Sequence, residues 1–277
     1  MSENFDFPVY FKRTEKADEI LKSVDITRYA VKDGKPDKCI TAMTTDAGMA
    51  LIEKGISYWK IDVASERGIE PGDTTPKMVS VTATWYTAEE AKEKGIKVVA
   101  GSSANVFSGL GALLVPDGFN IPTVLATQEN VKYYGLELIE NNHGLAITSA
   151  KCDIVLMKYD YKENYKKEFL MKLHGGGGIF IETHDFPHLH IPTSEKCGGY
   201  IVIGKRISAD EFNFTAFQIP FNYALYTPAN TIHGDGTLVG EYALTVADPK
   251  MISADTVLIY NENSKTMEEG VVPDWKA

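Results

Sequence analysis

Short runs of apolar residues, most of them β-branched or aromatic, dominate the second half of the chain. Turn residues separate many of these runs at intervals of roughly eight to twelve positions, a spacing typical of a β-sandwich or β-barrel. The runs lie at 152–159, 168–173, 178–183, 200–207, 212–219, 223–226, 242–246 and 256–260. No long helix is needed to explain this part of the sequence. We therefore predict an all-β, barrel-like domain over residues 145–277.

The first part of the chain has a more mixed pattern. Thr45 can cap a short helix over 47–54, and a capping box that begins at Thr87 predicts a second short helix over 88–94. Around these helices, strand-like runs lie at 56–63, 77–86, 96–100, 112–115, 123–126 and 134–139. We expect residues 1–144 to form a β-rich N-terminal unit that carries short helices.

The charge balance argues against a nucleic-acid-binding protein. Lysine and arginine total 28 against 38 acidic residues, which gives a formal net charge of −10. Only four of the basic residues are arginines: Arg13, Arg28, Arg67 and Arg206. A protein that binds duplex DNA needs a basic surface to displace the counterions of the phosphates. We expect no nucleic-acid partner.

Cysteine usage and hydropathy indicate a cytoplasmic protein. The three cysteines, Cys39, Cys152 and Cys197, are widely spaced and make neither a disulfide framework nor a CxxC metal motif. The N-terminus is polar and lacks the apolar core of a signal peptide. No run approaches the roughly 20 apolar residues of a membrane span. We expect no membrane association.

A cluster of histidines carries the candidate chemistry. Four of the six histidines fall between His174 and His190. His188 and His190 share one face if they lie in a strand, and a short turn could bring Glu195 back beside them. Two imidazoles and a carboxylate on one side of a divalent metal leave coordination positions open. His233, near the end of a later β pattern, offers a fourth ligand. The plainer alternative is a pair of ordinary strand histidines.

The spacing of these residues resembles the two motifs of the cupin superfamily. The chain carries HxH, four further residues and Glu, followed by PxNxxH at 228–233. The resemblance covers about residues 165–250 and implies a double-stranded β-helix, which is a jelly-roll-like barrel. It also implies that the metal ligands are His188, His190, Glu195 and His233.

The sequence departs from the cupin pattern at several turn positions. Glycines of the family motifs are replaced by Glu182, Val202 and Asn230, and Thr237 stands where asparagine is common. These departures bear on turn geometry more than on metal binding. Many cupins carry two barrels per chain, but the first half here has no HxH. The unit at 1–144 is at most a degenerate cupin barrel.

Two further residues are candidates for a catalytic role. His184 follows the same alternation as His188 and could carry a proton beside the metal, because histidine titrates near neutral pH. Tyr226 lies in the run that leads toward His233, and its phenol could orient a bound anion or lend a proton. A solvated rim histidine and a routine barrel-lining tyrosine are the alternatives.

Two other features are interpreted as structural. The glycines at 175–178 are not followed by the Gly-Lys-Ser/Thr or the helix that a phosphate-binding loop requires, so they indicate a turn. Cys197, two residues after Glu195, is expected to be a packed thiol rather than a site residue.

The predicted site defines a small group of functions. Three histidines and one glutamate leave two adjacent positions for a chelating hydroxy-carbonyl substrate, or for substrate and dioxygen. The metal would be one divalent transition ion, iron, manganese, nickel or zinc. We expect a metal-dependent enzyme that acts on a small oxygenated metabolite, with dioxygenase chemistry preferred. A sugar or sugar-acid isomerase or lyase is the enzymatic alternative, and a non-catalytic binding or storage protein is the other. The resemblance also implies a possible homodimer.

Overall fold

The structure is a computed structural model, and ten stretches of the chain are described. They are residues 16–17, 19–20, 27–32, 35–52, 54–60, 76–98, 109–140, 143–162, 179–268 and 271. The apolar run at 168–173 and the glycines at 175–178 lie outside the described residues, as do Arg13, Arg67 and His174.

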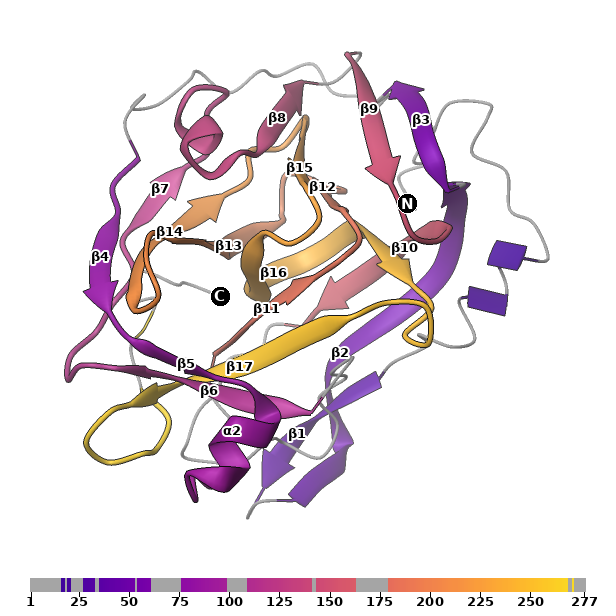
Figure 1. Ribbon diagram of the computed structural model, residues 1–277. Helices are drawn as coiled ribbons and strands as arrows, with labels where there is room; N and C mark the ends of the chain where they lie inside the picture. Colours follow the sequence, from indigo (N-terminus) through magenta and orange to yellow (C-terminus); the bar gives the residue numbers. More distant parts are fainter. Residues whose placement is uncertain are drawn as a thin grey trace.

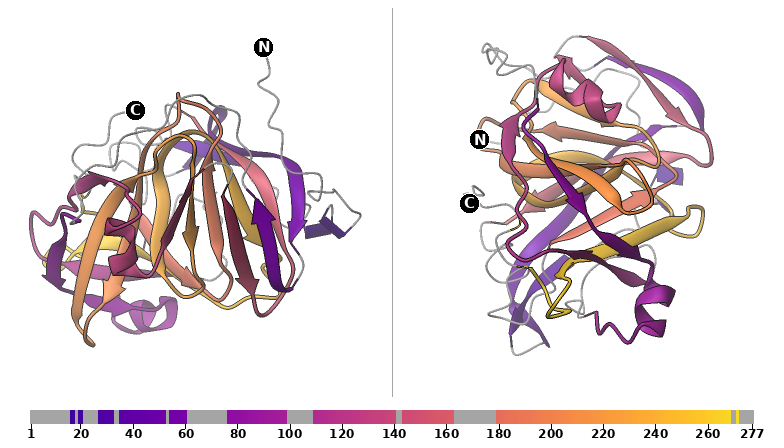
Figure 2. Two further views of the ribbon diagram at one scale, coloured as in Figure 1. Left: turned by 90° about the horizontal axis from the view of Figure 1, so that it is seen from above. Right: turned by 60° about the vertical axis from the view of Figure 1, so that its left-hand side comes forward.

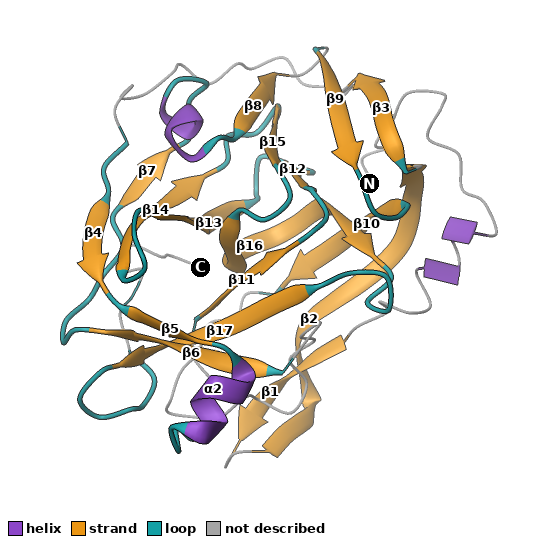
Figure 3. Cartoon of the chain, viewed as in Figure 1, coloured by secondary structure: helices purple, strands orange, loops and turns teal. Residues whose placement is uncertain are grey.

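Strands dominate the described chain, as the sequence pattern predicts (Figures 1 and 3). Short helical segments accompany them, among them α2 (Ala88–Glu93), the 3-10 helix η1 (Asn130–Tyr134) and helical residues at 16–17 and 19–20. The strands are β1 (Thr27–Lys32), β2 (Lys35–Ile52), β3 (Gly55–Lys60), β4 (Val79–Thr82), β5 (Thr84–Tyr86), β6 (Leu110–Val115), β7 (Thr123–Leu125), β8 (Glu137–Glu140), β9 (Gly144–Ser149), β10 (Ile154–Tyr161), β11 (Phe180–His184), β12 (His188–Pro192), β13 (Gly198–Arg206), β14 (Glu211–Gln218), β15 (Tyr223–Thr227), β16 (Ile232–Ala247) and β17 (Ala254–Asn261).

Most of these strands form one curved, mixed sheet, and β3 pairs with β9 in a separate two-stranded sheet (Figure 2). Strand β16 runs through the middle of the large sheet. Its first half pairs with β11 and β13, and its second half pairs with β10 and β12. Gly240 lies between the two halves with a φ of 94°, a conformation that favours glycine. The all-β prediction is therefore confirmed at the level of fold class.

Strands from the first 144 residues pair directly with strands from the rest of the chain. β2 pairs with β10, β4 and β7 pair with β14, β8 pairs with β15, and β6 pairs with β17. The pairs β7–β14 and β6–β17 are parallel, and the others are antiparallel. Hydrogen bonding thus crosses the boundary that the sequence pattern suggests near residue 145.

One expected helix forms and the other does not. Helix α2 begins at the predicted capping box, in which the Thr87 side chain accepts from the Glu90 backbone and the Glu90 side chain accepts from the Thr87 backbone. The helix expected over 47–54 is wrong, because residues up to Ile52 belong to β2. That segment pairs with β10, and Ile52 lies opposite Ile154. Pairing along a long strand therefore overrides a weak local helix signal.

The core is divided into two clusters by the sheet, and β12 separates them. Leu189 and Ile191 pack into the smaller cluster together with Phe186 and Tyr226. Because side chains alternate along a strand, His188 and His190 lie on the opposite face. All five residues of β12 are buried, so the two histidines lie in the interior of the molecule.

The length and the apolar character of the described helices bear on membrane insertion. Among the described residues, none of them combines the length and the apolar character that crossing a bilayer requires.

Candidate metal centre

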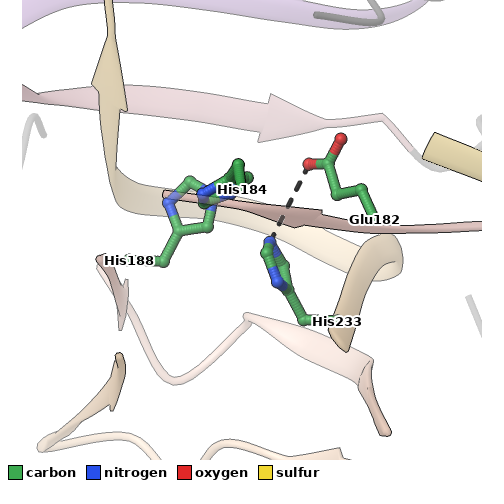
Figure 4. Close-up of side chains that lie close together, drawn as sticks. All are labelled: Glu182, His184, His188 and His233. Carbon is green, nitrogen blue, oxygen red and sulfur yellow. Dashed lines mark hydrogen bonds and ion pairs between the residues drawn. The ribbon is translucent and has the colours of Figure 1, made fainter. Parts of the chain in front are cut away.

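Four buried side chains converge at one point of the large sheet. Glu182 and His184 come from β11, His188 from β12 and His233 from β16. One potential ligand atom from each of these residues lies within 4.8 Å of the others. Figure 4 shows the three imidazoles and the carboxylate directed toward one another.

Strand geometry explains how residues from three strands reach this point. Glu182 and His184 are two residues apart in β11, so both point to the same face. Glu182 lies directly opposite His233 in the pairing of β11 with β16. Residues 185–187 connect β11 to β12 and leave His188 beside His184, with their Nε2 atoms 2.8 Å apart. The His184 ring also stacks on Phe186, with ring centroids 3.9 Å apart.

The turn that precedes His233 depends on Asn230. This residue has a φ of 66°, in the left-handed region that asparagine tolerates better than most residues. Its backbone N–H donates to the carbonyl of His184 at 2.7 Å, which ties the turn to β11. Asn230, which stands where the cupin motif has glycine, therefore adopts the backbone conformation of this turn.

Hydrogen bonds at Nδ1 define the tautomers of the histidines. His184 Nδ1 lies 2.9 Å from the carbonyl of Phe186, and His233 Nδ1 lies 2.9 Å from the carbonyl of Thr231. A carbonyl oxygen only accepts, so each Nδ1 carries the hydrogen and each Nε2 carries a lone pair in the neutral ring. This arrangement is the one that orients a histidine for metal binding.

His188 follows the same arrangement through a hydroxyl group. Its Nδ1 lies 3.4 Å from Thr245 Oγ1, and that hydroxyl donates its hydrogen to the carbonyl of Pro187. The hydroxyl therefore accepts from Nδ1, which leaves a lone pair on Nε2 of His188. This Nε2 lies 2.8 Å from Nε2 of His184. Two lone pairs that face each other at this distance repel unless a cation lies between or beside them.

Burial keeps these imidazoles uncharged. Desolvation lowers the pKa of His184 and His188 well below its ordinary value, and nearby histidines lower it further. Burial also lowers the pKa of His233, against the opposing effect of Asp235. Neutral imidazole is the form that binds metals, so no proton has to be removed from the site at neutral pH.

Glu182 supplies the anion of the cluster. One of its oxygens accepts a hydrogen bond from Thr256 Oγ1 at 3.1 Å, and the other lies 3.8 Å from Nε2 of His233. Donor atoms around a metal at about 2.1 Å lie roughly 3 to 4 Å from one another. The spacing of the four side chains therefore fits a transition metal after small movements.

Glu195, the carboxylate expected from the sequence, lies elsewhere. It is exposed at the tip of the turn between β12 and β13. Both strands run antiparallel to β16 and pair with consecutive parts of it, so the chain between them does not reverse direction. Thr193 and Cys197 also hold this turn on the carbonyl of Glu241. Glu195 is therefore not brought back to the histidines.

The positions of His184 and His190 relative to the cluster differ from those expected from the sequence motif. His184, expected to carry protons, belongs to the four-residue cluster. His190, expected to be a ligand, is fully buried with its ring centroid 5.1 Å from that of His188, but it lies outside the cluster. Burial lowers the pKa of His190 to about 3.

Tyr226 points away from the histidines. It lies opposite Leu189 in the pairing of β12 with β15, so it shares the apolar face of β12. Its hydroxyl accepts from the backbone N–H of Thr148 at 3.3 Å. The neighbouring Thr227 lies opposite His188, so its side chain lies on the face of the sheet that carries the histidines.

Glu182 is not among the metal ligands expected from the sequence. A signal for it exists, because Glu182 is the one charged residue in the apolar run at 178–183 and lies two positions before His184. A buried carboxylate in such a strand needs a compensating partner. The alternation thus places it on the face of His184.

Comparisons of the chain with protein-family models, with curated proteins and with solved structures found no match.

Proposed function

We propose that this protein binds one divalent transition metal through Glu182, His184, His188 and His233. The observation that supports the proposal is the convergence of three neutral imidazole nitrogens with a buried carboxylate. Each histidine has an oxygen atom at its Nδ1 that holds the ring in the orientation for binding through Nε2.

We propose further that the barrel is of the cupin type, with a ligand set shifted toward the N-terminus. Support comes from the antiparallel pairing of β12 with β15 and β16 and from the presence of His188 and His233 in both ligand sets. The shifted set replaces His190 and Glu195 by His184 and Glu182. The net donor composition, three histidines and one glutamate, stays the same.

The donor set favours a catalytic metal over a structural one. Imidazole and carboxylate ligands suit iron, manganese, nickel and zinc, and four protein ligands leave positions open when the metal is six-coordinate. When bound, such a metal supplies Lewis acidity at an oxygen atom of a substrate. We therefore propose a metal-dependent enzyme that acts on a small oxygenated metabolite.

Among the enzymatic candidates we favour a dioxygenase. An isomerase or lyase needs a side chain that moves a proton beside the substrate. The two residues suggested for this task do not serve it, because His184 joins the ligand cluster and Tyr226 lies on the other face of the sheet. A dioxygenase places both atoms of O₂ in its product and requires no such carrier.

Metal analysis tests the binding proposal. We expect close to one equivalent of a transition metal in the purified wild-type chain, and loss of that metal in His188→Ala and in His233→Ala. The exposed His143 provides a matched control, and His143→Ala is expected to keep its metal. Full metal content in both site variants would contradict the ligand assignment.

A metabolite screen that records oxygen consumption then tests the reaction. We expect oxygen uptake by anaerobically purified, metal-loaded protein with a hydroxy-carbonyl compound, and none with the His233→Ala variant. Conversion of a metabolite without oxygen uptake would favour an isomerase or lyase. A protein without stoichiometric metal would favour a binding or storage role.

A further inference from the structure

The described residues leave the hydrogen-bonding capacity of the His190 side chain unused. The residue is fully buried, and neither ring nitrogen has a hydrogen-bond partner within the part of the chain that the structure describes. Its direct neighbours across the two adjacent strands are Leu225 and Leu244, which offer only apolar contacts. A buried polar group without a partner destabilises the fold, so its presence points to a ligand or an ordered water.

Thr227, on the same face of the sheet, is a second buried polar side chain without a hydrogen-bond partner among the described residues. It is 1% exposed, and the atom concerned is Oγ1. Thr227 lies opposite His188, one strand away, so its hydroxyl belongs to the interior that contains His190. Two buried side chains beside the candidate metal centre thus offer a neutral donor and acceptor each.

The charged groups around His190 and Thr227 indicate whether a charged or an uncharged ligand is preferred. The buried polar and charged residues of the described chain include Glu182 and the histidines of this interior, but no lysine or arginine. Glu182 already adds a negative charge beside these rings. Apart from the proposed metal, a carboxylate group of a ligand would meet the anion of Glu182 and no buried cation among the described residues.

We propose that His190 and Thr227 form the binding site for an uncharged ligand that carries neighbouring hydroxyl and carbonyl oxygens. The proposal rests on the proposed metal function, since the ligand would lie beside His188 and its oxygen atoms would also contact the bound metal. His190 and Thr227 bind and orient this ligand and are not metal ligands.

A spectroscopic titration tests the proposal without a known substrate. The chain is loaded with Co²⁺, whose visible spectrum reports changes at the metal, and is titrated with hydroxyacetone and, separately, with glycolate. The two probes have similar size and the same pair of neighbouring oxygens, but only glycolate is charged. The variants are His190→Leu and Thr227→Val, and Tyr226→Phe is the matched control because it removes a hydroxyl from the opposite face of the same strand.

We expect hydroxyacetone to change the spectrum of the wild type and to bind about five- to tenfold more weakly to His190→Leu and to Thr227→Val, as expected for one lost hydrogen bond. Co²⁺ affinity should change less than about threefold in both variants, and Tyr226→Phe should match the wild type. Glycolate should bind the loaded protein more weakly than hydroxyacetone, although its charge gives it the stronger attraction to free Co²⁺ in water.

Three outcomes would overturn the proposal. Equal hydroxyacetone affinity in the wild type and both variants would mean that His190 and Thr227 contact a buried water and not the ligand. Tighter binding of glycolate would contradict the uncharged ligand class. Loss of Co²⁺ in His190→Leu to the extent seen in His188→Ala would make His190 a metal ligand. A wild type that binds no Co²⁺ would instead refute the proposed function itself, together with the inference that depends on it.

Discussion

At the scale of single residues, the site depends on side chains whose polar atoms have specific partners. Glu182 is held by Thr256 at 3.1 Å, while Glu195, thirteen positions later in the sequence, lies exposed in a turn. The two glutamates therefore provide a direct comparison. Both are isosteric with glutamine, so the substitution changes the charge and leaves the shape.

Glu182→Gln should weaken metal binding by at least about 10- to 100-fold, the range typical of disturbing a metal site. The reason is that Glu182 is the one carboxylate in the cluster of possible ligands found among the described residues. Glu195→Gln should leave the metal affinity unchanged. Competitive metal titrations of the three proteins measure both effects. If Glu195→Gln weakened the metal affinity and Glu182→Gln left it unchanged, the metal ligand would be Glu195, as the sequence motif predicts.

Burial of four histidines makes the stability of the metal-free protein sensitive to acid. Their pKa values are lowered in the folded chain, whereas in the unfolded chain they titrate near about 6.5. Below that pH the unfolded state takes up protons that the folded state excludes. The free energy of unfolding should therefore fall as the pH decreases from about 6.5, by on the order of 1 kcal/mol per histidine and pH unit.

His190→Leu should reduce this pH dependence, because it removes one histidine whose pKa is lowered to about 3. Thermal unfolding of chelator-treated protein between about pH 5 and 7.5, the range in which histidine titrates, measures the slope. The exposed His143 serves as control, and His143→Gln should keep the wild-type slope. An unchanged slope in His190→Leu would mean that His190 accepts a proton in the folded state.

At the scale of the elements, β16 positions the site because it contacts the strands that carry the other ligands. His233 lies between Glu182 of β11 and Ile203 of β13. The next residue, Gly234, is packed against β11 so closely that a Cβ atom there would lie 2.4 Å from the carbonyl oxygen of Phe180. Glycine at this position thus permits the close approach of β11 and β16.

Gly234→Ala should destabilise the fold by about 1–3 kcal/mol, a typical cost of overpacking, and should also weaken metal binding. The two strands have to separate to make room for the methyl group, which moves Glu182 away from His233. Gly198→Ala is the control, because no atom lies within 4 Å of the position of its Cβ. Chemical denaturation and metal titration of both variants provide the comparison. Similar behaviour of the two variants would show that the strand spacing is not limiting.

At the scale of the whole molecule, the two halves of the sequence share one sheet. A fragment of residues 145–277 would leave β10, β14, β15 and β17 each without a pairing partner from the first half. Unpaired strand edges expose backbone groups and promote aggregation. We therefore expect the fragment not to fold, although the full chain does.

Amide dispersion in a two-dimensional NMR spectrum and the cooperativity of thermal unfolding test this expectation. The full chain should give a dispersed spectrum and a cooperative transition, and the fragment should give neither. A dispersed spectrum from the fragment would establish an autonomous C-terminal barrel, as the sequence pattern by itself suggests.

Local patterns in the sequence determined the features that depend on neighbouring residues. The β-branched runs indicated most strands of the second half, and the capping box at Thr87 indicated helix α2. The two-residue period placed His188 and His190 on a common face. Propensity, capping and alternation act within a few residues of each other, so the sequence contains them directly.

Long-range pairing decided the features that the sequence left open. The segment at 47–52 became a strand because β10 pairs with it, and Glu182 rather than Glu195 lies near the histidines because β11 pairs with β16 while the turn after β12 does not reverse. Tyr226 faces away because its strand register puts it opposite Leu189. Alternation tells which residues share a face, but the register between distant strands decides what that face meets, and only the tertiary structure sets that register.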